Sequence, residues 1–304
     1  MTKFNLTIAF IFLQVILTKY TFGQGCSDAG FCTINSFKPN STDSIKETIN
    51  QLKIGVFFGK ADHSIFVYGS YIEYNRLIND EFSVDIKLTS LAQNGNDISE
   101  FGFSDLFINV TYNVNKKIKL ILGAKVPFSL ANRSLNDLPL PMDYQSSLGT
   151  FDLIFGVGYQ IKRLQFVAAI QQPITQNDNQ FLASSYPLNS ELSVFQSTNK
   201  FKRSGDVLLR ISYPINLSKN FKLTPSILPI YHLSNDKYTD ELNMEREIAG
   251  SQGLTLNGNL YLDYKINKMM GLQLNVGSPF IVRESRPDGL TRSFIANLEY
   301  KIKF

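Results

Sequence analysis

The sequence has 304 residues, with 30 Lys and Arg against 26 Asp and Glu, which gives a net charge of +4. This positive excess is small and scattered, so it does not form the basic patch of a nucleic-acid-binding protein. After the first 23 residues no stretch is apolar enough for a transmembrane helix. Membrane-spanning strands escape this test, because their alternating pattern averages to near-neutral hydropathy.

The first residues predict a signal peptide over 1–23. Lys3 gives a positive start, 6–17 is an apolar run, and Thr21 and Gly23 place small residues where a signal peptidase reads them. A membrane anchor is the alternative, but the run is shorter than the about 20 residues that a spanning helix needs. We therefore expect cleavage after Gly23 and export of the mature chain.

The next segment, 24–51, is polar and irregular. Its Cys26 and Cys32 are the two cysteines of the chain, and in an oxidising compartment they predict a small-loop disulfide. Lipid attachment at Cys26 is the alternative, although Gly23 stands where lipoprotein signals usually carry Leu. No histidine is near enough in sequence to indicate a metal site.

A capping-box spacing within this segment predicts one short amphipathic helix. Ser44 and Glu47 stand ahead of Ile45, Ile49 and Leu52, which fall on one helical face. The whole segment 24–51 is either a hatch that plugs a pore or a periplasmic tail.

From residue 52 onward the apolar pattern has a period of two. In the last strand Phe294, Leu298 and Phe304 fall on one face, whereas Asn297 and Glu299 fall on the other. The same alternation predicts twelve strands, at 52–60, 64–77, 82–92, 102–115, 118–129, 148–161, 164–175, 205–216, 221–234, 254–267, 269–280 and 293–304. An even number returns the chain to the side on which it started.

The connections between these strands alternate in length. The links near residues 79, 116, 162, 219 and 267 are short, whereas those on the other side, apart from 60–63, are long and rich in Asn, Asp, Ser and Pro. Short turns opposite long loops are typical of outer-membrane barrels. We predict an all-β fold over 52–304: an antiparallel transmembrane β-barrel of about 12 strands in the bacterial outer membrane, with its first strand paired to its last.

The last residues resemble the signal by which outer-membrane barrels are recognised for assembly. This signal has a final aromatic residue preceded by apolar residues at alternating positions, here Phe304 after Ile302 and Tyr300. The resemblance implies two partners, the barrel-assembly machinery and outer-membrane lipid.

A second resemblance covers about 100–172. It is carried by Gly102-Phe103-Ser104-Asp105, Tyr112, Lys125-Val126-Pro127, Ser147-Leu148-Gly149-Thr150-Phe151-Asp152, Gly156 and Tyr159. These motifs resemble the FadL-related outer-membrane family of phenol meta-pathway transporters. The resemblance implies passive uptake of small molecules, hydrophobic or aromatic ones among them, through a barrel obstructed by an amino-terminal segment. Residues 25–32 and 286–292 also resemble segments of Bacteroidetes outer-membrane proteins.

One motif suggests catalysis. His232-Leu233-Ser234-Asn235 is similar to the His-x-Ser-Asn of outer-membrane phospholipase A and lipid A deacylases, in which the imidazole takes the hydroxyl proton. Asn257 is a candidate third member. The alternation of inward and outward residues along this strand, however, predicts that His232 and Ser234 point into the lumen, whereas a lipase needs them to face lipid. The lipid hydrolase is therefore an alternative, and no catalytic residue is favoured.

The polar faces of the predicted strands supply the residues expected to line the lumen. They mix both signs and are Asp105, Lys125, Asp152, Arg210, Asp263, Glu299 and Lys301. They form either a hydrated ladder that sorts solutes or ion pairs that plug the interior. We predict passive uptake of a small-molecule solute, with a non-catalytic structural or interaction barrel as a further alternative. No motif calls for a cofactor, a metal or nucleic acid.

Overall fold

The strands form where apolar and polar residues alternate, because successive side chains of an extended chain point to opposite faces. The computed structural model describes residues 34–39, 50–289 and 293–304. The barrel strands are β1 (Asn50–Lys60), β2 (Phe66–Leu77), β3 (Phe82–Gly95), β4 (Ile98–Asn113), β5 (Ile118–Pro127), β8 (Asp152–Ile161), β9 (Leu164–Pro173), β10 (Asp206–Ser212), β11 (Ile215–Asn216), β12 (Phe221–His232), β15 (Gly253–Lys265), β16 (Met270–Ile281) and β17 (Phe294–Lys303). The remaining elements are the short strands β6 (Ser134–Leu135), β7 (Leu138–Pro139), β13 (Lys237–Thr239) and β14 (Glu245–Glu247), and the 3-10 helices η2 (Asn35–Phe37), η4 (Met142–Tyr144), η5 (Ala183–Ser185) and η6 (Glu191–Val194).

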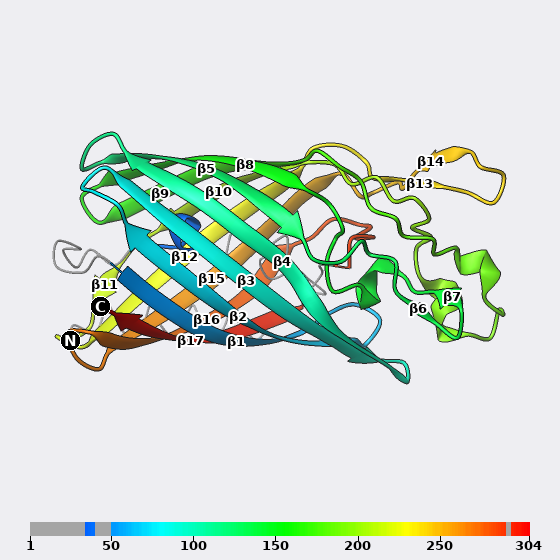
Figure 1. Ribbon diagram of the computed structural model, residues 1–304, viewed down its shortest axis with the longest axis horizontal. Helices are drawn as coiled ribbons and strands as arrows, with labels where there is room; N and C mark the ends of the chain where they lie inside the picture. The colour runs from blue at the N-terminus through cyan, green and yellow to red at the C-terminus, as the bar shows by residue number, and fades with distance from the viewer. Residues whose placement is uncertain (1–33, 40–49, 290–292) are drawn as a thin grey trace.

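The sheet closes on itself, as the sequence predicted. β1 pairs with β17, from Gln51 opposite Lys303 to Lys60 opposite Phe294. β10 and β11 both pair with β12, so they are two parts of one strand, interrupted at Pro214, which has no backbone N–H to donate. Counting them as one gives a closed barrel of 12 antiparallel strands (Figure 1).

The two faces of each strand differ in exposure. On β17, Leu298 is 48% exposed and Glu299 is 1% exposed; on β8, Phe155 is 49% exposed and Ile154 is fully buried. The exposed apolar side chains recur on every long strand and form a belt around the barrel. A belt of this extent is stable against lipid and not against water.

The connections differ in length at the two ends of the barrel. The turns 78–81, 114–117, 162–163, 217–220 and 266–269 and the carboxyl end lie at one end, and the loops 128–151, 174–205 and 233–252 lie at the other (Figure 1). The short-turn end corresponds to the periplasm and the long-loop end to the cell exterior.

One expectation about local structure was wrong. The long loop expected between strands 82–92 and 102–115 is instead a turn at Asn96 and Asp97, because β3 and β4 continue beyond the predicted ends. Both turn residues have positive φ, 51° and 59°, as a two-residue hairpin of matching twist requires. The short amphipathic helix expected within 24–51 falls on residues that lie outside the described ranges, and Leu52 lies in β1, in agreement with the strand expected from residue 52.

Candidate functional site inside the barrel

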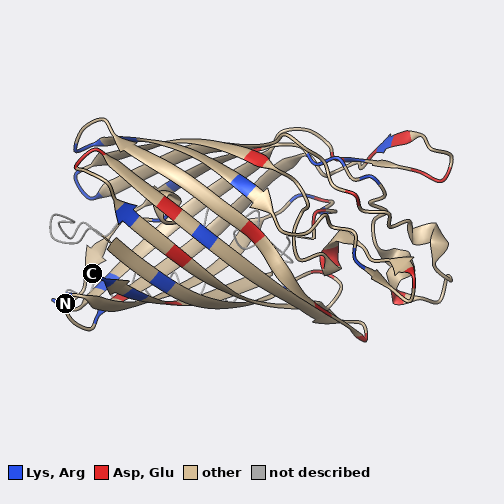
Figure 2. Ribbon diagram, viewed as in Figure 1, with Lys and Arg blue, Asp and Glu red and all other residues tan. Residues whose placement is uncertain are grey.

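All seven residues predicted to line the lumen lie on the inward face of the barrel. Asp105, Lys125, Asp152, Arg210 and Glu299 are each no more than 1% exposed, and Asp263 and Lys301 are partly exposed nearer the periplasmic end. Figure 2 shows acidic and basic residues on neighbouring strands along the barrel. The interior is therefore rich in charge on a wall whose outer side faces lipid.

These interior charges contact one another. The Lys125 ammonium lies 3.1 Å from Asp152 Oδ2 and donates to Thr150 Oγ1 at 2.9 Å. Near the periplasmic end, the Lys301 ammonium lies 3.2 Å from Asp263 Oδ1. Of the two arrangements expected from the sequence, a hydrated ladder and an interior filled by ion pairs, these contacts match the ion pairs.

A short piece of the amino-terminal region lies inside the barrel. We call residues 34–39, which contain η2, the interior segment (Figure 1). The Lys38 ammonium lies 2.7 Å from Glu299 Oε2, and both side chains are buried. The Asn35 N–H donates to Glu73 Oε1 at 2.8 Å, and its side-chain oxygen accepts from the Lys53 ammonium at 2.6 Å.

The strands on the other side of the barrel also hold the interior segment. Lys119 on β5 donates to the Ser36 carbonyl oxygen at 2.5 Å, and Arg210 on β10 donates to the Phe37 carbonyl oxygen at 3.1 Å. The Ser36 hydroxyl donates to Asp85 on β3. Ser36 Oγ also lies 3.1 Å from Thr111 Oγ1 on β4. Contacts from β1, β2, β3, β4, β5, β10 and β17 therefore surround the segment.

Sequence reasoning placed a hatch or tail over 24–51 but did not identify what would hold it. Glu73, Lys119 and Lys38 were absent from the predicted site. The period-two pattern of β2 and β5 already sends Glu73 and Lys119 inward. That pattern carries no information about which segment these side chains bind.

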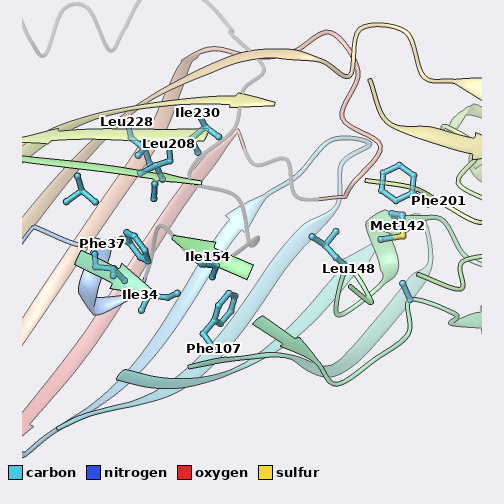
Figure 3. Close-up of a cluster of buried hydrophobic side chains, with 14 of the residues drawn as sticks. Ile34, Phe37, Phe107, Met142, Leu148, Ile154, Phe201, Leu208, Leu228 and Ile230 are labelled. Atoms are coloured by element: carbon cyan, nitrogen blue, oxygen red, sulfur yellow. The ribbon is translucent and has the colours of Figure 1, made fainter. Parts of the chain in front are cut away.

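The interior segment also has an apolar contact with the wall. Ile34 and Phe37 are fully buried in a cluster with Phe107 and Ile154 (Figure 3). The Phe37 ring lies where a side chain at Gly156 would be, since a Cβ there would lie 2.5 Å from Phe37 Cε1. The absence of a side chain at residue 156 makes room for this ring.

At the long-loop end, His232 lies between two carboxylates. Its Nδ1 is 2.7 Å from Asp206 Oδ1 and its Nε2 is 2.7 Å from Asp236 Oδ1. Arg203 pairs with Asp206, and the Arg283 guanidinium lies 3.0 Å from Asp288 Oδ2. We call these six residues the loop network, because they tie 174–205, 233–252 and 282–289 to the ends of β10 and β12.

The loop network shifts the titration of its own members. Burial raises the pKa of Asp288, but the Arg283 and Arg203 guanidinium groups outweigh this effect and hold the pKa below its usual value. Burial lowers the pKa of Arg203, and Asp206 and Asp288 outweigh that effect and raise it. Both shifts favour the charged forms, which stabilises the network.

The three catalytic candidates do not form a triad. His232 points inward, as predicted, but Ser234 lies beyond the end of β12; its side chain is exposed and bonds Ser204 Oγ at 2.8 Å. The expectation that Ser234 points into the lumen was therefore wrong. The Asn257 amide donates to the Leu228 carbonyl oxygen at 3.4 Å. Both ring nitrogens of His232 are already bound to carboxylates, so neither is directed to a serine hydroxyl.

The other predicted sites lie partly outside the described residues. The signal peptide and the Cys26 and Cys32 pair fall in 1–33. Tyr300, Ile302 and Phe304 lie on the outward face of β17 and its end, and the Phe304 N–H donates to the Asn50 carbonyl oxygen at 3.0 Å. Within the described ranges no group of three or more His, Cys, Asp or Glu side chains is placed to hold a metal ion.

A closed antiparallel barrel with an apolar belt outside and paired charges inside is the architecture of a bacterial outer-membrane β-barrel protein, and this chain is one. No protein-family model and no curated protein matches the sequence. None of the helices in the described ranges is long and apolar enough to cross a membrane, a result that has no bearing on crossing by strands.

Solved structures share this fold. An outer-membrane channel from Pseudomonas putida F1 matches with a TM-score of 0.60 at 10% identity, covering 88% of this chain and all of that one. Weaker matches include the toluene transporter TbuX from Ralstonia pickettii (TM-score 0.38, 10% identity, 84% of this chain and 90% of that one) and a FadL homologue from Pseudomonas aeruginosa (0.38, 8%, 85% and 91%). The structural neighbours thus include FadL-family transporters, and at these identities the likeness concerns the fold.

Proposed function

We propose that this barrel is a passive route of uptake for small molecules, hydrophobic or aromatic ones among them, and that the interior segment is its hatch. The observation that carries the proposal is the way in which residues 34–39 are held. Polar side chains of seven strands of the wall, β1, β2, β3, β4, β5, β10 and β17, contact these residues. Side-chain contacts can be released without breaking the strand pairing that closes the barrel.

The wall that the hatch touches supports a preference for apolar solutes. Inward side chains on six consecutive strands from β4 to β12 form an apolar surface, which we call the apolar sector. Its members are Phe107, Ile121, Ile154, Val167, Ala169, Leu208, Leu228 and Ile230. Ile34 and Phe37 of the hatch belong to the same cluster (Figure 3). A solute that displaces the hatch meets this surface, in agreement with the FadL-type resemblance of 100–172.

The test of the hatch crowds the position of the Phe37 ring and leaves the charged residues that hold the interior segment unchanged. In Gly156→Val the new side chain overlaps the Phe37 ring, and overpacking of this kind costs about 1–3 kcal/mol. Release of the hatch relieves that cost, so the open population should rise by about 5- to 150-fold. We expect proteoliposomes of this variant to swell faster in arabinose than those of the wild type.

Gly258→Val is the matched control. A Cβ at Gly258 would lie 2.7 Å from the ring of Phe280, so the crowding is similar, but this glycine alternates with the inward Asn257 and Asn259 and faces outward. We expect no change in swelling from it. Heat-modifiable electrophoretic mobility establishes that both variants are folded. Equal swelling rates for the two folded variants would contradict the role of the interior segment as a hatch. Absence of permeation in every form would contradict uptake itself.

The hydrolase alternative has a separate test. It requires release of fatty acid from phospholipid or lipid A, lost in both Ser234→Ala and His232→Ala. The contacts of His232 with Asp206 and Asp236 favour a structural role for this histidine, so we expect no release. A purely structural barrel would show neither release nor permeation.

A further inference from the structure

Three buried asparagines next to the apolar sector have hydrogen-bonding atoms that the protein does not use. Among the buried side chains of the described ranges, Asn109 and Asn259 lack a partner at both amide atoms, and Asn257 lacks one at its oxygen. All three are at most 5% exposed. Buried amides are nearly always hydrogen-bonded, so a cluster of this kind calls for an explanation.

The strand register places these amides at the two edges of the apolar sector. Asn109 follows Phe107 on the inward face of β4, which is the first strand of the sector. Asn257 lies directly opposite Leu228 of β12, which is the last strand of the sector, and Asn259 is the next inward residue on β15. We call Asn109, Asn257 and Asn259 the edge amides. A molecule that rests on the apolar sector therefore has an unpaired amide on either side.

A glycine on the next strand accommodates an amide at each edge. Gly123 lies opposite Asn109, and a Cβ there would be 1.9 Å from Asn109 Oδ1. Gly277 lies opposite Asn259, and a Cβ there would be 2.7 Å from Asn259 Oδ1. Gly123 lies on β5, a strand of the apolar sector, and Gly277 lies on β16, on the side of β15 that faces away from the sector. Each glycine leaves room for the neighbouring amide.

Charged side chains of the interior form ion pairs with one another. Lys125 pairs with Asp152, and Lys53 lies 3.6 Å from Glu73. An amide is uncharged and offers both donors and an acceptor. The hydrogen-bonding capacity that the edge amides offer is therefore neutral.

We propose that Asn109, Asn257 and Asn259 recognise the solute of this barrel, which is an uncharged molecule with an apolar body and hydrogen-bonding groups. The apolar body packs on the apolar sector, in the place of Ile34 and Phe37. The polar groups bind the edge amides. This inference rests on the proposed uptake function and adds to it the polar half of the specificity.

Three probes of one shape separate the contributions. Benzamide is neutral and both donates and accepts, benzoate carries a charge, and toluene has no hydrogen-bonding group. Binding to the purified full-length barrel is measured by equilibrium dialysis, and partition into empty detergent micelles is subtracted. We expect benzamide to bind at least about tenfold more tightly than either of the others, as two added hydrogen bonds would give.

Substitution of the edge amides should remove this preference. Benzamide has one carboxamide, and the two edges lie on opposite sides of the barrel, so it binds at either edge but not at both together. In the double variant Asn109→Leu/Asn259→Leu we expect the affinity for benzamide to fall about tenfold, while that for toluene is retained. Asn297→Leu is the control, because this buried asparagine already accepts a hydrogen bond from the Tyr71 hydroxyl at 3.3 Å. Heat-modifiable mobility establishes that each barrel is folded.

The outcomes distinguish this inference from the uptake proposal. Equal binding of benzamide and toluene by the wild type, or an unchanged preference in the double variant, overturns the role of the edge amides and leaves uptake standing. Arabinose permeation without binding of any probe also overturns the role of the edge amides and leaves uptake standing. Absence of both permeation and binding overturns the two proposals together.

Discussion

His232→Leu should release the loop network, and the charge balance of that network explains why. Each ring nitrogen lies 2.7 Å from a carboxylate oxygen, so each must carry a proton to donate, and the ring is an imidazolium. With Arg203 and Arg283 it makes three positive charges against the three carboxylates Asp206, Asp236 and Asp288. Leucine has a similar volume but leaves one negative charge without compensation.

The size of the effect follows from burial. The side chains of His232, Asp206 and Asp236 are 1%, 5% and 0% exposed. Removal of one partner from a buried charged group of this kind costs about 3–5 kcal/mol. At 1.4 kcal/mol for each factor of ten, opening of the loops should become about 140- to 3,700-fold more frequent.

Amide hydrogen exchange in the loops measures this opening. The most informative sites are the N–H of Ser204, which donates to Asp236 Oδ1 at 2.9 Å, and the N–H of Asp236, which donates to Ser251 Oγ at 2.8 Å. Ser234→Ala is the control, because it removes one exposed hydroxyl contact and should change exchange less than about fivefold. Asp236→Asn added to His232→Leu restores the charge balance and should recover part of the protection. Exchange in His232→Leu equal to that of the wild type would refute the reasoning.

Three further predictions concern the barrel and its loops. Lys125→Met leaves Asp152 buried without its cation and should lower the free energy of unfolding by about 3–5 kcal/mol, measured by urea titration of the folded electrophoretic form; an unaltered midpoint would contradict the pairing. Because the pKa of Asp288 is held below its ordinary 3.8, its contribution is complete above that pH and is lost as the pH falls further. The protection factors of the amides in 282–289, which correct exchange for its intrinsic dependence on pH, should therefore not fall between neutral pH and about 4 and should fall only below it; a loss of protection near pH 6 would be inconsistent with this assignment. Asn96→Val places a β-branched residue at a φ of 51° and should weaken the β3–β4 turn by about 1–2 kcal/mol, seen as faster exchange at Gly95 and Ile98, whereas Asn96→Gly should not.

The strands and their faces were largely predictable. The expected strand 164–175 corresponds to Leu164–Pro173, and the alternation that assigned Leu298 outward and Glu299 inward agrees with their exposures. The predictions failed where the pattern stops. Ser234 continues the alternation in sequence, but the strand ends at His232, so its side chain no longer follows the parity of β12.

The sequence by itself determined the compartment, the barrel and the inward or outward direction of each strand residue, because strand alternation is a local property of the extended chain. Only the tertiary structure decided which inward residues meet. Lys38 and Glu299 are 261 positions apart and become partners only because the barrel closes around the interior segment. The pairing of Phe37 with Gly156, and the placement of Asn109 and Asn259 at the edges of one apolar surface, depend on that same closure.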